Sequence, residues 1–194
     1  MNKKLLLLLA LLTACMLQAC HGNSIQTNSD DEDDDTVTAN VDTSKNSSIV
    51  IGNDDIRFIT GMAEACLVEI KIGNMAKQRG ADKRVRNFGA MMVKDLTKGR
   101  KRLDSLARIK KIALPDSISW NSEVTINQLA QKTGKDFDRA YLEKMSSDYK
   151  NAIAQFQYTA KSAYDPQIKA FANRHLMTVQ RHLDLIDAIH STLK

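Results

Sequence analysis

The 194-residue sequence has few of the residues that interrupt helices or build β-sheets. It contains two prolines and eight glycines, and aromatic residues make up only 5% of it. All-β domains consist of many short strands joined by glycine- and proline-rich turns, and their strands are enriched in aromatic residues. The composition therefore argues against an all-β fold and predicts an all-α fold.

Cysteine is also scarce, and its spacing argues against several kinds of site. Cys15, Cys20 and Cys66 lie far apart and form neither a metal-ligand motif nor a disulfide framework. Cys66 falls on an apolar helix face, where cysteine usually behaves as a small hydrophobic residue. The sequence has no glycine-rich phosphate loop and no nucleophile elbow. We therefore expect a protein that is not an enzyme.

The N-terminus carries a short apolar run. Residues 5–12 are almost all leucine and follow lysines at positions 3–4, which is typical of an export signal. A membrane-spanning helix needs about 20 apolar residues, so this run is too short to cross a bilayer. The segment ends in Leu17-Gln18-Ala19-Cys20, which resembles the bacterial lipobox. We predict a lipoprotein signal peptide over residues 1–19 and lipidation at Cys20.

Two alternatives exist for this segment. Leu12-Thr13-Ala14-Cys15 fits the lipobox slightly better in its side chains. Cleavage there would leave an unusually short signal and keep part of the apolar run on the mature protein. The second alternative is an ordinary secretory signal with incidental cysteines. We favour Cys20, where several acyl chains, at about 0.8 kcal/mol for each buried methylene, would anchor the protein stably.

Residues 20–50 are predicted to form a disordered acidic tether. They are rich in Asn, Ser, Thr and Asp, so they cannot bury enough apolar surface to offset chain entropy. We interpret the acidic run 30–35 as a solvated spacer. A calcium site is the alternative, but the run lacks the glycine and the distal glutamate of an EF-hand loop. The net charge of +5 thus combines an acidic tether with a basic domain, and export argues against a nucleic-acid partner.

Four long helices and one short helix are predicted in residues 51–194. Asp82 and Asp165-Pro166 are typical helix starts, whereas Gly80 and Gly134 end or interrupt helices. The expected helices span about 53–78, 82–111, 123–132, 135–162 and 166–194. Because most connections are short, we expect an up-down four-helix bundle with the short extra helix between the second and third long helices.

The second long helix has the clearest two-sided pattern. Between Val85 and Leu106, apolar or small residues recur in steps of three and four, which places them on one helix face. The remaining positions are basic: Lys94, Lys98, Arg100, Lys101 and Arg102, followed by Lys110 and Lys111. We interpret this basic face as solvated. Contact with anionic lipid, lipopolysaccharide phosphate or peptidoglycan is the alternative.

Polar residues at inward positions are the candidates for chemistry. Glu69 on the first helix and His175 and His182 on the last helix fall on inward faces, and Asp95 and Asp148 fall at the edges of such faces. A glutamate and a histidine that face each other inside a bundle could bind a metal, or they could form a hydrogen-bonded buried pair. A ferritin-like di-iron centre needs Glu-x-x-His on two helices, and the sequence lacks that motif.

Several stretches, in this order, resemble a bacterial family of ferritin-like envelope proteins with no assigned function, once labelled predicted outer membrane proteins. They are EIKIGNMA, VRNFGAMMVKDLTK, Leu114-Pro115, GKDFDRAYLEKM and FANRHLMTVQRHL. The resemblance covers about residues 54–194. It implies a ferritin-like four-helix bundle in a bacterial envelope.

The same resemblance implies the remnant of a metal site. The family pattern has an Asp-His pair in the second helix, another in the third and a histidine in the fourth, beside a glutamate in the first. The matching metal-ligand candidates here are Glu69, Asp95, Asp148 and His182. Leu96 and Tyr149 stand where histidines are usual, so we predict no cofactor.

These observations predict a membrane-anchored lipoprotein of the bacterial outer membrane. It would be held by lipidated Cys20 and would have a non-enzymatic binding or structural role toward an envelope protein or glycan. A metal-binding or oxidative-stress protein with a reduced site is the alternative. Inside the bundle, Glu69 should lie within hydrogen-bond reach of His182, Tyr149 or water, with Leu96 packed beside it. If charge attraction outweighs burial, the pKa of His182 is raised.

Overall fold

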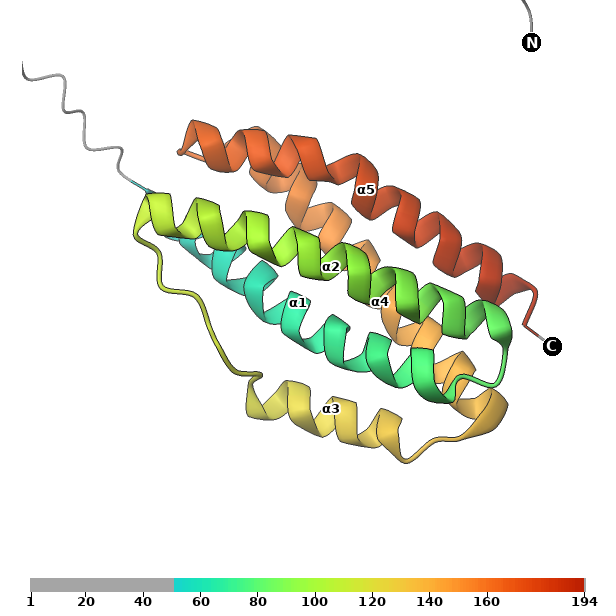
Figure 1. Ribbon diagram of the computed structural model, residues 1–194. Coiled ribbons are helices and arrows are strands. Elements are labelled where there is room, and N and C mark those ends of the chain that lie inside the picture. The colour runs from blue at the N-terminus through green and yellow to red at the C-terminus, as the bar shows by residue number, and fades with distance from the viewer. Residues whose placement is uncertain (1–50, 194) are drawn as a thin grey trace, which may run out of the picture. The chain divides into compact units, whose positions relative to one another are not determined.

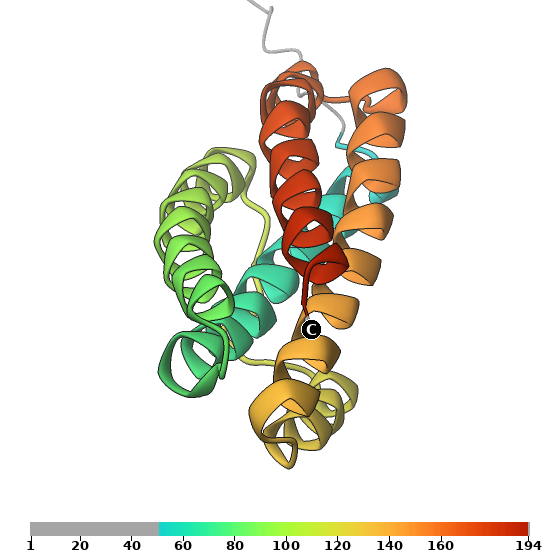
Figure 2. The ribbon, with the colours of Figure 1, turned by 90° about the vertical axis from the view of Figure 1, so that its right-hand side faces the viewer.

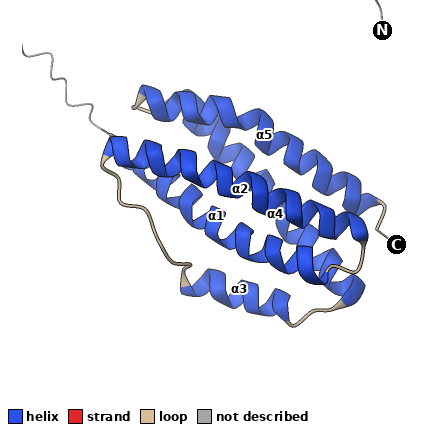
Figure 3. Ribbon diagram, in the orientation of Figure 1, coloured by secondary structure: helices blue, strands red, loops and turns tan. Residues whose placement is uncertain are grey.

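The computed structural model describes residues 51–193, and this part of the chain is helical (Figure 1). Its helices are α1 (Asn53–Arg79), α2 (Lys83–Lys110), α3 (Trp120–Ala130), α4 (Gly134–Ser162) and α5 (Pro166–Ser191). No strand occurs among the described residues, so the all-α prediction is confirmed (Figure 3). The predicted signal peptide 1–19, the lipidation site Cys20 and most of the predicted tether, up to residue 50, lie outside the described residues.

The four long helices pack as two helical hairpins. A short turn joins α1 to α2, and another joins α4 to α5, and the two helices of each pair lie side by side. The view along the bundle shows the α1/α2 pair beside the α4/α5 pair (Figure 2). The short helix α3 contacts both α1 and α4. Among residues 51–193, no helix is long and apolar enough to span a membrane.

Polar caps define the helix ends much as the sequence predicts. The Asp82 carboxylate accepts from the backbone N–H of Arg84 at the start of α2. The Asp165 carboxylate accepts from the backbone N–H groups of Gln167 and Ile168 at the start of α5. These side chains satisfy N–H groups that have no partner within the helix. At its C-terminus, α2 ends in a left-handed residue, Lys111, with φ of 56°.

The short helix begins earlier than predicted. α3 starts at Trp120 and ends at Ala130, whereas the prediction was 123–132. The Ser119 side chain caps it by accepting from the backbone N–H of Ser122. The ion pair between Lys71 of α1 and Glu123, at 2.8 Å, holds the helix against the bundle. The sequence did not predict the first turn of α3 because apolar periodicity is weak in so short a segment.

One residue of the predicted basic face is buried. The Lys110 ammonium lies 2.6 Å from the Asp165 carboxylate, and both side chains are almost inaccessible to solvent. Lys110 therefore joins the C-terminus of α2 to the N-terminus of α5, and the interpretation of Lys110 as part of a solvated face is wrong. A cation at a helix C-terminus is also favoured by the helix dipole.

The core consists of two separate apolar clusters. One lies towards the α1–α2 turn and includes Ile72, Val85 and Tyr141. The other lies towards the opposite end and includes Phe58, Leu103 and Ile168. All four long helices contribute to both clusters, and Val179 of α5 packs against both.

The α1–α2 turn depends on a buried carboxylate of α4. Asp138 is 1% exposed and accepts from the backbone N–H groups of Ala81 and Asp82 at 2.9 and 2.6 Å. We expect Asp138→Ala to lower the free energy of unfolding by about 1–3 kcal/mol, because both N–H groups lose their acceptor. Asp136→Ala is the matched control, since Asp136 is exposed on the same helix and makes one long ion pair. Chemical denaturation measures both; equal effects would contradict this role of Asp138.

Candidate functional site

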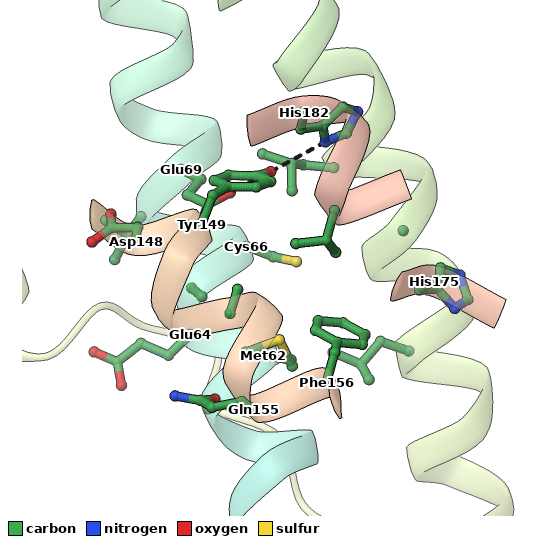
Figure 4. Close-up of a pocket in the computed structure, with 18 of the residues that line it drawn as sticks. Met62, Glu64, Cys66, Glu69, Asp148, Tyr149, Gln155, Phe156, His175 and His182 are labelled. Carbon is green, nitrogen blue, oxygen red and sulfur yellow. Dashed lines mark hydrogen bonds between the residues drawn. The ribbon is translucent and has the colours of Figure 1, made fainter. Parts of the chain in front are cut away.

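A cavity of about 760 Å³ lies between the two hairpins. Side chains from all four long helices line it, and most of the interior wall is apolar: Met62, Ala65, Leu96, Leu103, Phe156 and Val179. This volume is in the range of small-molecule binding sites, about 300–1,000 Å³. The close-up shows Met62 and Cys66 of α1 and Phe156 of α4 around the hollow (Figure 4).

Small residues at the same level of three helices produce this cavity. Gly61 and Ala65 of α1, Gly99 of α2 and Ala152 of α4 all line it. A Cβ atom added at Gly61 or Gly99 would meet nothing within 4 Å. Protein interiors are normally filled to crystal-like density. An opening of this size in the middle of a bundle is therefore a departure from normal interior packing.

A chain of hydrogen bonds forms the polar part of the cavity wall. The Tyr149 hydroxyl lies 3.1 Å from Oε2 of Glu69 and 3.4 Å from Nδ1 of His182. On its other side, Nε2 of His182 lies 3.3 Å from the Asp95 carboxylate. The prediction that Glu69 lies within reach of Tyr149 is thus confirmed. Four residues from four helices are joined in the order Glu69, Tyr149, His182, Asp95.

The Glu69 end of this chain is held uncharged near neutral pH. The pKa of Glu69 is raised to about 8, mainly by burial and in part by the charge of the nearby Asp148 carboxylate. The hydrogen bond with Tyr149 and the charge of Lys144 act in the opposite direction. Burial likewise raises the pKa of Tyr149 well above its usual value. A carboxyl group in an apolar setting favours the neutral form because it loses the solvation of its charge.

The histidine is also uncharged near neutral pH. Burial lowers the pKa of His182, and the hydrogen bond that Nε2 donates to Asp95 and the charge of Asp95 oppose this only in part. The charge of the neighbouring Arg181 lowers the pKa further. The condition under which we expected a raised pKa is therefore not met, because desolvation outweighs attraction and the partner of Nε2 is Asp95 rather than Glu69.

These protonation states fix the direction of the hydrogen bonds. A neutral His182 that donates from Nε2 to Asp95 presents Nδ1 as an acceptor, so the Tyr149 proton can point to it. A protonated Glu69 can then donate to the Tyr149 oxygen. When Glu69 is ionised, Tyr149 must donate to Glu69 and Nδ1 of His182 loses its donor. The neutral state of Glu69 therefore satisfies the whole chain.

Asp148 and Leu96, which were predicted to lie with Glu69 and His182, also line the cavity. Asp148 accepts a hydrogen bond from Lys144 at 2.9 Å. In the close-up, its side chain is on the opposite side of the cavity from His182 (Figure 4). Leu96 lines the cavity and packs against the cluster that contains Tyr149. Among residues 51–193, no group of three or more His, Cys, Asp or Glu side chains is placed to hold a metal ion.

Cys66 faces the cavity without the properties of a nucleophile. The pKa of its thiol is raised to about 12, mainly by burial and in part by the charge of Glu69. A reactive cysteine needs a stabilised thiolate in an electropositive setting. Cys66 therefore acts as a small lining residue, in keeping with the interpretation made from its apolar helix face.

The sequence contained a signal for the cavity that periodicity alone did not reveal. The predicted inward stripes of α2 and α4 carry small residues at Gly99 and Ala152, where a packed core has large residues. Sequence patterns did not reveal the three cations Lys98, Arg102 and Arg181 as one group, because α2 and α5 are far apart in sequence. All three line the cavity at the side where these two helices face each other.

Comparisons with known proteins give a family and a fold. A family model described as a domain of unknown function (DUF4142) matches residues 40–189. A solved structure, described as the crystal structure of a DUF305 fragment from Deinococcus radiodurans, superposes with a TM-score of 0.65 at 12% sequence identity. The match covers 74% of this chain and 99% of that chain. No curated protein matches the sequence.

Proposed function

The chain belongs to the family described as a domain of unknown function, DUF4142, and from that premise we propose that it is a membrane-anchored envelope lipoprotein with a non-enzymatic binding role. In this proposal the four long helices form an up-down bundle of the ferritin-like type, and the central cavity is the binding site. The family resemblance, the lipobox and the acidic tether support the envelope setting. Nucleic acid is not a partner in this proposal.

The cavity is the observation that carries the binding role. It combines about 760 Å³ of space with apolar side chains in its interior and polar or charged side chains around them, and its volume is in the range of small-molecule sites. Its polar chain is internally satisfied, and its cysteine is held as a thiol. Such a site can hold and orient a ligand, while the described residues provide no activated nucleophile.

An apolar fluorescent probe without charge tests the binding role. We expect it to bind the full chain in lipid nanodiscs and to brighten as it leaves water. Gly99→Leu should abolish this protein-specific signal because the new side chain enters the open space. Ser105→Leu adds the same side chain at an exposed position of α2 and should leave the signal unchanged. Equal signals from Gly99→Leu and the parent chain would refute the cavity as the site.

The anchor requires its own test, because Cys20 lies outside the described residues. We expect Cys20→Ser to release the protein from the membrane fraction and Cys15→Ser to leave it there. Mass spectrometry of the mature N-terminus should show an acylated residue that derives from Cys20. An unmodified N-terminus, or one that begins at Cys15, would contradict this part of the proposal. A pull-down from native membranes would then identify the envelope protein or glycan that the bundle contacts.

A metal-binding or oxidative-stress protein with a reduced site is the second candidate. The observation in its favour is that Asp95 and His182, from α2 and α5, meet at 3.3 Å beside the cavity. Elemental analysis of protein purified without chelator separates the candidates. The binding proposal expects less than about a tenth of an equivalent of iron, manganese or zinc. Close to one equivalent, lost in His182→Ala, would establish the metal function instead.

A further inference from the structure

Exposed residues line the cavity on two sides, at openings that differ in charge. Between α2 and α5 the lining includes Lys98, Arg102 and Arg181, with Asp95 as the acidic residue. On the side of α1 and α4 the lining includes Glu64 and the ion pair of Lys144 with Asp148. Figure 4 shows these sides apart, with His175 and His182 on one and Glu64 and Asp148 on the other. The first opening is therefore basic and the second is not.

The cations of the basic opening have no acidic partner in the described part of the chain. None of the ion pairs within residues 51–193 involves Lys98, Arg102 or Arg181, and Asp95 is engaged by His182. Lys98 and Arg102 are four residues apart on α2, so they repel each other on one helix face. An anion between the two helices would relieve this repulsion.

The charge of this opening reaches into the cavity. Burial lowers the pKa of His175, and the charges of Arg102 and Arg174 lower it further, against the hydrogen bond to the backbone oxygen of Phe171. Nδ1 of His175 lies 2.8 Å from that oxygen, which an uncharged ring satisfies by donating. A half-buried, neutral histidine thus lies between the cations at the opening and the apolar interior, and it adds no charge that would exclude an apolar chain.

We propose that the cavity binds a single-chain anionic amphiphile, with its hydrocarbon chain inside and its carboxylate or phosphate head at Lys98, Arg102 and Arg181. This inference rests on the proposed binding function and specifies the ligand class. The apolar walls provide the site for the chain, and guanidinium groups suit either head because they donate two parallel hydrogen bonds to an oxyanion. The volume suits a single hydrocarbon chain, as ligands of this size fill sites of a few hundred cubic ångströms.

Four ten-carbon compounds with different heads test the ligand class: decanoate, decyl phosphate, decanol and decyltrimethylammonium. Each compound is added to the parent chain and to Gly99→Leu in identical nanodiscs, and the amount bound to each sample is measured. The difference between the two samples is the binding to the cavity, because partition into the lipid is the same in both. We expect one or both anions to bind at least about tenfold more tightly than the alcohol, and the ammonium compound to bind most weakly. The two anion arms separate a fatty acid from a phosphate-bearing lipid.

Charge-neutral variants locate the head group. Arg102→Gln combined with Arg181→Gln should lower anion affinity about tenfold, to the level of the alcohol, and leave the alcohol unchanged. Lys101→Gln is the matched control, since Lys101 is an exposed neighbour outside the lining. Gly61→Leu is a second blocking variant should Gly99→Leu fail to fold. If all four compounds bind equally and the glutamine variants do not change their affinity, the proposed ligand class is wrong and the proposed binding function stands. If none of the compounds binds, both the ligand class and the binding function are wrong.

Discussion

Replacement of Gly89 with alanine is expected to lower the free energy of unfolding by about 2–3 kcal/mol, which is within the range for overpacked interiors. A Cβ atom at this position of α2 would lie 2.7 Å from the Gly73 carbonyl oxygen and 2.8 Å from the Lys77 backbone nitrogen. Both are backbone atoms of α1, so no side-chain rotation relieves the contact. The two helices would have to separate.

Gly99→Ala is the matched control for this prediction. Gly99 also lies within α2, but its added Cβ meets nothing within 4 Å. Alanine is a better helix former than glycine, so this variant should gain about 0.5–1 kcal/mol. Chemical denaturation followed by circular dichroism measures both variants in the full chain. Similar effects from Gly89→Ala and Gly99→Ala would show that the close approach of α1 and α2 does not contribute to stability.

The contrast between these glycines shows what the sequence could and could not predict. Both lie on the predicted inward stripe of α2, and period alone treats them alike. Gly89 allows helix contact because it faces Gly73 of α1, whereas Gly99 lines the cavity and a Cβ atom added there would meet nothing within 4 Å. Which residues of two helices come into contact depends on how the helices pack. The sequence pattern of α2 alone therefore cannot distinguish a glycine at a helix contact from a glycine that lines a cavity.

Helix ends were predictable where the cap chemistry is local. The starts at Asp82 and Asp165 and the end at Gly80 depend on one side chain or one glycine, and each lies where the sequence predicts it. Lys110 was misinterpreted because its partner Asp165 is 55 residues further along the chain. Burial of a charge in a non-local ion pair leaves no trace in the helical period around it.

The candidate site was predicted in part for the same reason. The inward positions of Glu69 and His182 follow from helical period, and both are buried. Tyr149 was identified through the family resemblance as a residue that replaces a histidine, and its hydroxyl connects the two. The partner of His182 could not be predicted, because Asp95 lies at the edge of its stripe and only the packing of α2 against α5 brings it into reach.

Replacement of Glu69 with glutamine is expected to remove a large part of the pH dependence of stability. The pKa of Glu69 is raised from 4.5 to about 8 in the folded protein, chiefly by burial. The folded state therefore holds a proton that the unfolded state releases between these values. The stability of the parent chain should fall as pH rises through this window, by up to about 1.4 kcal/mol for each pH unit.

The glutamine variant keeps the shape of the side chain and does not ionise. Its amide N–H can donate to the Tyr149 oxygen as a protonated Glu69 does, so the hydrogen bonds to Tyr149 and His182 are preserved. We expect Glu69→Gln to match the parent chain within about 1 kcal/mol at pH 5. At pH 8 it should be more stable by about 2–4 kcal/mol. The lowered pKa values of His175 and His182 remove stability as pH falls through about 6.5 in both proteins, so they largely cancel in the difference.

Glu64→Gln is the control, because Glu64 is on the same helix and has the opposite shift. Hydrogen bonds from Ser119 and Ser122 lower the pKa of Glu64 despite partial burial. The stability it contributes is present above its unfolded pKa of 4.5 and is lost as pH falls through the lowered folded value. The difference between Glu64→Gln and the parent chain should therefore stay constant from pH 5 to pH 8. Denaturation curves at four pH values measure all three proteins, and parallel profiles for Glu69→Gln and the parent chain would show that Glu69 remains ionised inside the bundle.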